Sequence, residues 1–186
     1  MKLRRGFKSE ANAISRELRA ELNLEKHDPL CPWELADYLE ISISPISSLA
    51  TAAPSAIDYL MGSGSKFMSA VTIFGGRHGL LRHVYHNDGH ARTRQAANIS
   101  HELSHAILGH PPTEMFSPDP VAEQEAHWLG PALLVSEEAA TRIAYRGIEV
   151  PEAAEAYGVS KSLMQMRLNN TGALIRAQRS RRRSSS

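Results

Sequence analysis

Two histidines stand four residues apart in the stretch His101-Glu102-Leu103-Ser104-His105, and a glutamate follows the first of them. On an α-helix this spacing places both imidazoles on one face, one turn apart, so that they can bind a single Zn2+. Glu102 then lies beside the metal without binding it, where it can take a proton from an attacking water molecule. The pattern therefore predicts metal-assisted hydrolysis of a peptide bond, with Glu102 as the general base.

The residues around this motif favour a helix. Residues 94–100 contain no helix breaker. Ile99, Leu103 and Ile107 recur with the helical period and predict one buried face. Gly109 and the two prolines that follow soon after it end the pattern. The alternative is that the two motif histidines are ordinary surface or core residues with no metal between them.

A second helix is expected downstream, after a proline-rich connector over residues 111–120. Asp119 is a candidate N-cap, and Pro120 fits the first helical position. Because a short connector between two helices favours antiparallel packing, we expect this helix to return alongside the motif helix.

Three side chains on this second helix are candidates for the third protein ligand that a catalytic zinc site usually has. Glu123 and His127 share one helical face, whereas Glu125 points elsewhere. We therefore expect Glu123 to face the two motif histidines and Glu125 to be a solvated carboxylate.

The stretch from Ala91 to His110 resembles the ImmA/IrrE family of zinc metallo-endopeptidases, and so does the later stretch 123–135. The later stretch is similar to the family pattern E-x-E-A-N-x-F-A-x-x-L-L-M-P, in which the first glutamate binds zinc. The resemblance thus implies a Zn2+ held by His101, His105 and Glu123. It also implies a zincin-like fold and a protein substrate, because family members typically cleave helix-turn-helix repressors.

The chain departs from the family pattern at three places. His127 stands where the family usually has asparagine, Gly130-Pro131 interrupts the expected helix, and Ser136 replaces a proline. We expect His127 to hydrogen-bond to a zinc ligand, and the alternative is that it binds zinc itself. The donor that stabilises the developing oxyanion is left open among Tyr85, His86, His90, His110 and Tyr145.

The rest of the chain predicts an α+β fold. Helices are expected over residues 9–24, 33–39, 137–145, 152–157 and 161–169, and strands over 41–44, 66–74 and 80–86. The strands predict a small antiparallel sheet beside the motif helix. We divide the chain into a zincin-like metallopeptidase domain (1–146), a helix-turn-helix-like helical hairpin (147–175) and a disordered basic tail (176–186).

The C-terminal segment has a marked charge bias. Residues 161–186 contain seven basic residues and no acidic one. Such a segment could neutralise the phosphates of a nucleic acid, through Lys161, Ser162, Gln165 and Arg167 on the second helix of the hairpin. The alternative, which we favour, is a plain helical hairpin that completes the fold and is followed by a solubilising tail.

Composition narrows the class of protein. The 186 residues are 42% hydrophobic and carry a formal net charge of +1, which is ordinary for a soluble globular domain. The single cysteine, Cys31, fits a reducing compartment. No apolar run is long enough to cross a membrane. We expect a cytoplasmic protein without membrane contact.

Two other functions compete with the peptidase. One is a DNA-binding regulator whose zinc fold is structural. The other is a toxin-antitoxin or phage partner protein that binds without cutting. The presence of Glu102 favours the peptidase, because a purely structural zinc fold has no need of a general base.

Overall fold

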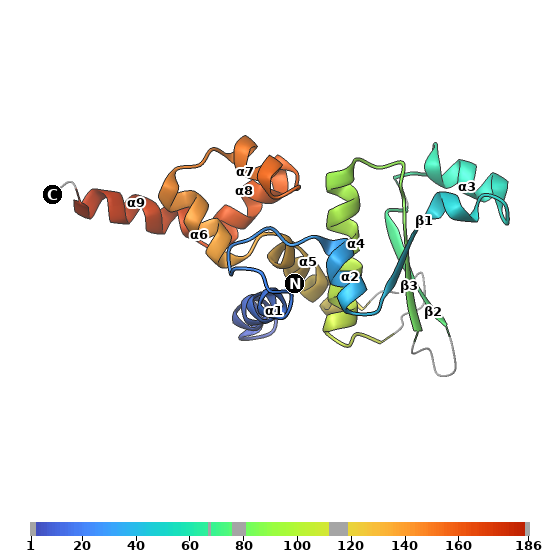
Figure 1. Ribbon diagram of the computed structural model, residues 1–186, viewed down its shortest axis with the longest axis horizontal. Helices are drawn as coiled ribbons and strands as arrows, with labels where there is room; N and C mark the ends of the chain where they lie inside the picture. Colours follow the sequence, from blue (N-terminus) through green and yellow to red (C-terminus); the bar gives the residue numbers. More distant parts are fainter. Residues whose placement is uncertain (1–2, 67, 76–80, 112–118, 185–186) are drawn as a thin grey trace.

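The computed structural model describes residues 3–66, 68–75, 81–111 and 119–184. These residues form a mixed α+β fold, as predicted, with a small sheet at one end and helices along the rest of the molecule (Figure 1). Most of the predicted proline-rich connector lies outside the described residues. Among the described residues, no helix has the length and hydrophobicity that crossing a membrane would require.

The sheet is built from β1 (Ser42–Pro45), β2 (Ala70–Gly75) and β3 (Leu81–His86), in the order β1-β3-β2. β2 is antiparallel to β3, whereas β1 is parallel to β3. The prediction of an antiparallel sheet is therefore correct for one pair and wrong for the other. Between β1 and β3 the chain passes through η1 (Ile46–Leu49), α3 (Pro54–Met61) and β2, which together provide the crossover that a parallel pair needs.

Two long helices carry the predicted site. α4 (Arg92–Ile107) packs against the sheet on one side and against α5 (Pro120–Leu134) on the other (Figure 1). The predicted apolar stripe of α4 is confirmed, since Ile99 and Leu103 are fully buried. The helix ends where the sequence predicted, and Gly109 adopts the left-handed conformation (φ 67°) that suits a residue just past a helix C-terminus.

Two N-terminal helices pack against this pair. α1 (Phe7–Glu21) packs on α5, and α2 (Pro32–Tyr38) packs on α4. α1 begins two residues before the predicted cap at Ser9, because Phe7 is fully buried in the core that α1, α4 and α5 share. The residue before it, Gly6, has φ 86°, a conformation that a glycine adopts without strain.

A second hydrophobic core joins the C-terminal helices α6 (Glu137–Arg146), α7 (Val150–Ala156), α8 (Lys161–Asn170) and α9 (Ala173–Ser184). It includes the end of α5, and so it connects these helices to the helix that carries Glu123. The predicted domain boundary at residue 146 falls inside this core, between α6 and α7. The division into domains stays a prediction.

The basic tail is helical as far as the structure describes it. The sequence predicted disorder from residue 176, but α9 continues to Ser184. Two features explain the difference. Ala173 and Ala177, one helical turn apart, are buried in the C-terminal core. In addition, Arg176 lies 3.4 Å from a carboxylate oxygen of Glu137 on α6.

Candidate metal centre

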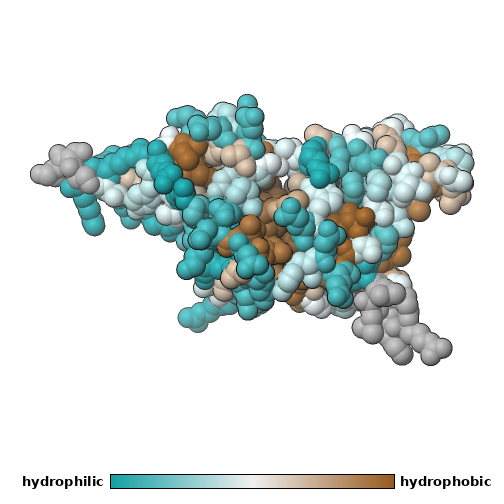
Figure 2. Space-filling model, viewed as in Figure 1, coloured by the Kyte–Doolittle hydropathy of each residue, from teal (hydrophilic) through white to brown (hydrophobic). Residues whose placement is uncertain are grey.

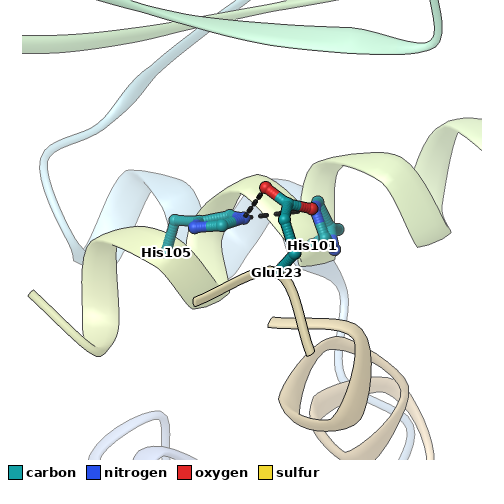
Figure 3. Close-up of side chains that lie close together, drawn as sticks. All are labelled: His101, His105 and Glu123. Atoms are coloured by element: carbon teal, nitrogen blue, oxygen red, sulfur yellow. Dashed lines mark hydrogen bonds and ion pairs between the residues drawn. The ribbon is translucent and has the colours of Figure 1, made fainter. Parts of the chain in front are cut away.

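α4 brings the two motif histidines together on one face, as their spacing predicted. Their Nε2 atoms are 3.2 Å apart. Glu123, in the first turn of α5, faces both rings (Figure 3). One carboxylate oxygen lies 3.3 Å from Nε2 of His101, and the other lies 3.4 Å from Nε2 of His105.

The position of Glu123 depends on how α5 begins and how closely it approaches α4. The predicted cap is confirmed, because the Asp119 side chain accepts a hydrogen bond of 2.8 Å from the backbone N–H of Val121. Pro120 occupies the first helical position. Farther along, the Ser100 hydroxyl on α4 donates to the backbone oxygen of Gly130 at 2.9 Å. α5 is therefore fixed at its start and is joined to α4 near its end.

The predicted interruption of this helix at Gly130-Pro131 is wrong, since α5 continues to Leu134. Gly130 faces the backbone of α4, and a β-carbon added there would lie 3.2 Å from the backbone nitrogen of His101. The glycine thus permits the close approach of the two helices. Pro131 comes near the C-terminal end, where the loss of one backbone N–H is tolerated with the helix continuing for one more turn.

The three ligand atoms have the spacing of a metal site. They all lie within 4.8 Å of one another. In a tetrahedral zinc site with bonds of about 2.0–2.1 Å, neighbouring ligand atoms are about 3.3 Å apart. The two imidazole Nε2 atoms are 3.2 Å apart, and they lie 3.3 and 3.4 Å from the two different carboxylate oxygens of Glu123, which is close to that value. The side chains of His101, His105 and Glu123 are 20%, 19% and 33% exposed, so solvent reaches the cluster. The residues therefore fit a zinc ion with an open position.

Burial keeps the two imidazoles neutral. Burial is the largest cause, and together with the nearby His105, His127 and His110 it lowers the pKa of His101 to about 3. It also lowers the pKa of His105 to about 4, with His110 as the next cause. Neutral imidazole is the form that binds metals, so both rings are ready to act as ligands near neutral pH.

Glu102 lies on the side of α4 that faces the sheet. The Thr72 hydroxyl on β2 donates a hydrogen bond of 2.5 Å to one of its carboxylate oxygens. Burial raises the pKa of Glu102, and this effect exceeds the opposing effect of the Thr72 hydrogen bond. A carboxylate with a raised pKa is a better proton acceptor. The sequence offered no signal for Thr72, because its contact with α4 depends on how the sheet packs.

Glu125 is not the solvated carboxylate that the sequence predicted, since it is only 6% exposed. It points away from Glu123, as expected, but it points into the protein. Arg4 donates to it at 2.6 Å, and Nε2 of His110 lies 3.4 Å from its other oxygen. The helical pattern identified the face correctly, but it gave no information about the N-terminal segment that covers this face.

His127 contacts the metal centre without joining the ligand cluster. It is exposed, and its ring centroid lies 4.6 Å from that of His101. In the described part of the chain, the cluster that could hold a metal consists of His101, His105 and Glu123. The expected hydrogen bond from His127 to a ligand stays a prediction.

The candidate oxyanion donors have different surroundings. The rings of Tyr85 and His83 stack, and His86 is buried edge-on against Trp33. The other three lie in different parts of the molecule. His90 contacts the backbone oxygen of Ser65, and Tyr145 lies on α6. His110 lies against His105 of the cluster.

The fold and the site together define a small α+β domain with a two-histidine, one-carboxylate cluster and a buried glutamate beside it. The model of the peptidase M78 family, the IrrE N-terminal-like domain, matches residues 69–169, which is more than half of the chain. The protein belongs to this family of metallopeptidases, as the resemblance implied, and the match includes every predicted site residue. No curated protein and no solved structure matches the chain.

Proposed function

We propose that the protein is a zinc-dependent endopeptidase with a zincin-type active site. The observation that supports this most directly is the convergence of His101, His105 and Glu123 at the spacing of a tetrahedral site. Membership of a metallopeptidase family supports it independently. A structural zinc site would use four protein ligands, whereas three ligands that solvent reaches leave room for a substrate.

Each residue has a distinct part in the proposed hydrolysis. When bound, zinc supplies Lewis acidity that polarises the scissile carbonyl and makes water more acidic. Glu102 accepts the proton of the attacking water at its carboxylate and returns it to the leaving amine. Thr72 holds the Glu102 carboxylate in place through its hydrogen bond. The low pKa values of His101 and His105 keep both rings available as neutral ligands.

The edge of the sheet provides a place for the substrate backbone. β2 pairs with β3 on one side, and no described strand pairs with its other side. An extended peptide can add to such an edge through backbone hydrogen bonds. Because Thr72 lies on β2 and contacts Glu102, a peptide added there would pass close to the general base.

The proposed substrate is a helix-turn-helix transcriptional repressor. This proposal rests on the family resemblance, and the β2 edge is compatible with it because strand addition reads the backbone of an extended segment. The test is to incubate the zinc-loaded protein with a repressor encoded beside its gene and to look for cut fragments by mass spectrometry. The Glu102→Gln variant is the control, because it keeps the ligands and removes only the proton acceptor. A repressor that remains intact with the wild-type protein would refute this substrate.

The zinc site can be tested without any substrate. Elemental analysis of the purified wild-type protein should find one zinc per chain, and His105→Ala should lose it. His83→Ala is the matched control, because His83 lies on β3 and hydrogen-bonds to Ser44 outside the cluster. Equal zinc content in all three proteins would contradict the ligand assignment.

We keep nucleic-acid contact by the C-terminal helices as a second candidate function. α7, a turn at Gly158 with φ 60° and α8 have the arrangement of a helix-turn-helix, and Lys161 is exposed at the start of α8. Figure 2 shows a mostly hydrophilic surface over α9. Arg167 is excluded as a contact, since it is 1% exposed and donates to the backbone oxygen of Val135.

Fluorescence anisotropy with a labelled DNA duplex tests this second function. Binding should weaken with added salt, and the double variant Lys161→Ala, Arg179→Ala should bind less well than wild type. Arg5→Ala, which removes an exposed arginine at the other end of the chain, is the control. Equal binding by wild type and the double variant would reject the nucleic-acid surface and favour a hairpin that only completes the fold.

A further inference from the structure

A line of polar contacts leads away from the metal centre on the far side of His105. Nε2 of this ring faces Glu123, and the opposite nitrogen, Nδ1, lies 2.9 Å from Nδ1 of His110 (Figure 3 shows the Glu123 side). Nε2 of His110 lies 3.4 Å from a carboxylate oxygen of Glu125. The other oxygen of Glu125 accepts a hydrogen bond of 2.6 Å from Arg4.

With both rings neutral, the carboxylate of Glu125 determines the positions of the protons in this line. A carboxylate only accepts, so Nε2 of His110 must carry the hydrogen. A neutral His110 then has no hydrogen on Nδ1, which becomes an acceptor. Nδ1 of His105 must therefore be the donor across the 2.9 Å contact. The remaining nitrogen of His105, Nε2, is left with a free lone pair toward Glu123 and His101.

The opposite arrangement would disable the site. If Nδ1 of His105 carried no hydrogen, its Nε2–H would point at the position where the three ligand atoms meet, and the lone pair needed for a metal would be absent. Only the Nδ1–H tautomer of His105 can therefore bind a metal through Nε2. In the structure, the acceptor that makes this choice is the buried carboxylate of Glu125, acting through His110.

Glu125 is itself held in place. It is 6% exposed, and a carboxylate buried to this extent needs a paired cation. Arg4 provides the cation through Nε, while its two terminal nitrogens bind Glu10 at 2.6 and 2.7 Å. The segment before α1 thus closes the line of contacts that starts at the metal centre.

We propose that His110 and Glu125 are positioning residues that hold His105 in its Nδ1–H tautomer, so that Nε2 is open toward a metal. The inference rests on the proposed function only in taking Nε2 as the metal-facing atom. His101 lacks a comparable partner among the described residues, because its Nδ1 is buried without a hydrogen bond. The control of the tautomer therefore applies to one of the two histidine ligands.

The direct test uses the full-length, metal-free protein labelled with 15N in its histidines. Long-range 1H–15N correlation spectra near neutral pH distinguish the two tautomers of each ring. We expect Nδ1–H for His105 and Nε2–H for His110. Observation of Nε2–H on His105 in the folded, metal-free protein would overturn the proposal. Because this measurement needs neither zinc nor a substrate, it can fail while the peptidase proposal holds, and it can succeed if no peptidase activity is found.

Variants test whether the line of contacts affects metal binding. Zinc affinity, measured by competition with a chromogenic chelator, should fall about 10- to 100-fold in Glu125→Leu, the usual effect of removing such a partner. The Nδ1–H signal of His105 should be lost as well. Glu125→Gln retains an acceptor oxygen and should preserve most of both. Gln124→Leu, the neighbouring position on α5, is the matched control and should resemble wild type.

Two results would reject this role for Glu125. One is a zinc affinity of Glu125→Leu within a factor of two of wild type. The other is an unchanged His105 tautomer in that variant. Should Glu125→Leu fail to fold, the pair Arg4→Ala and Arg5→Ala provides the comparison, because only the first removes the cation that holds Glu125. Equal zinc affinities in these two variants would then overturn the proposal.

Discussion

Gly130→Ala probes how closely the two site helices approach each other. A β-carbon added at Gly130 would lie 3.2 Å from the backbone nitrogen of His101, 3.3 Å from its α-carbon and 3.3 Å from the carbonyl carbon of Ser100. All three atoms belong to the backbone of α4 in mid-helix, so none can move aside as the end of a flexible side chain could. α4 and α5 must therefore separate by a few tenths of an ångström.

Two opposing effects decide the change in the free energy of unfolding. Replacing glycine by alanine in a helix interior stabilises by about 0.8–1.0 kcal/mol. Forcing an extra methyl group into a packed contact costs about 1–3 kcal/mol. Since the contact here is with rigid backbone, we expect the second effect to prevail, with a net destabilisation of about 1 kcal/mol. Zinc affinity should fall too, because Glu123 moves with α5 away from His101.

Urea unfolding of the metal-free protein measures the change in the free energy of unfolding, and competition with a chromogenic chelator measures the change in zinc affinity. Gly75→Ala is the control, because a β-carbon there would meet no atom within 4 Å. A Gly130→Ala protein that is more stable than wild type by the full helix-propensity amount, with unchanged zinc affinity, would refute the argument. It would mean that the two helices do not need a glycine at their contact.

Three further predictions concern the same centre. Thr72→Val removes the hydrogen bond that lowers the pKa of Glu102, so the acidic limb of the kcat/KM profile should move to higher pH; an unchanged profile would contradict this. Metal-free protein should lose stability as pH falls from 6.5 toward 4, by up to about 1.4 kcal/mol per pH unit for each buried histidine, because His101 and His105 have lowered pKa values and take up protons mainly when unfolded. Urea midpoints that stay constant over that pH range would contradict the lowered pKa values of the two histidines. His127→Asn should keep zinc affinity and peptide cleavage, and a large fall in affinity would make His127 a ligand.

The parts of the site that the sequence predicted correctly are those governed by local rules. The spacing of His101 and His105 determines that they share a helical face, and Asp119 with Pro120 marks where the next helix begins. Glu123 was expected to face the two histidines because two helices with a short connector pack antiparallel, and the resemblance to a known family indicated the same residue. These predictions required no knowledge of distant parts of the chain.

The parts that the sequence could not predict depend on contacts between distant segments. Thr72 meets Glu102 because the sheet packs on α4, and Glu125 is buried because the segment around Arg4 covers it. The parallel pairing of β1 likewise depends on the path of the chain through α3 and β2. Periodicity reports which face of a helix a residue occupies, but it does not report what lies opposite that face.

α5 connects the candidate metal centre, at its first turn, to the C-terminal core, at its last turn. A helix C-terminus leaves backbone oxygens without helical partners. Here the buried Arg19 of α1 donates to the oxygen of Leu133 at 2.7 Å, and the buried Arg167 of α8 donates to that of Val135 at 2.8 Å.

Burial lowers the pKa of both arginines, Arg19 and Arg167, to about 10, so they remain cationic near neutral pH and suit the negative end of the helix dipole. α5 therefore has its first turn at the ligand cluster, through Glu123, and its last turn held by helices from both ends of the chain. Any displacement of α8 that withdraws Arg167 must act on the same helix that carries Glu123. The C-terminal helices are consequently part of the support of the site, whatever else they bind.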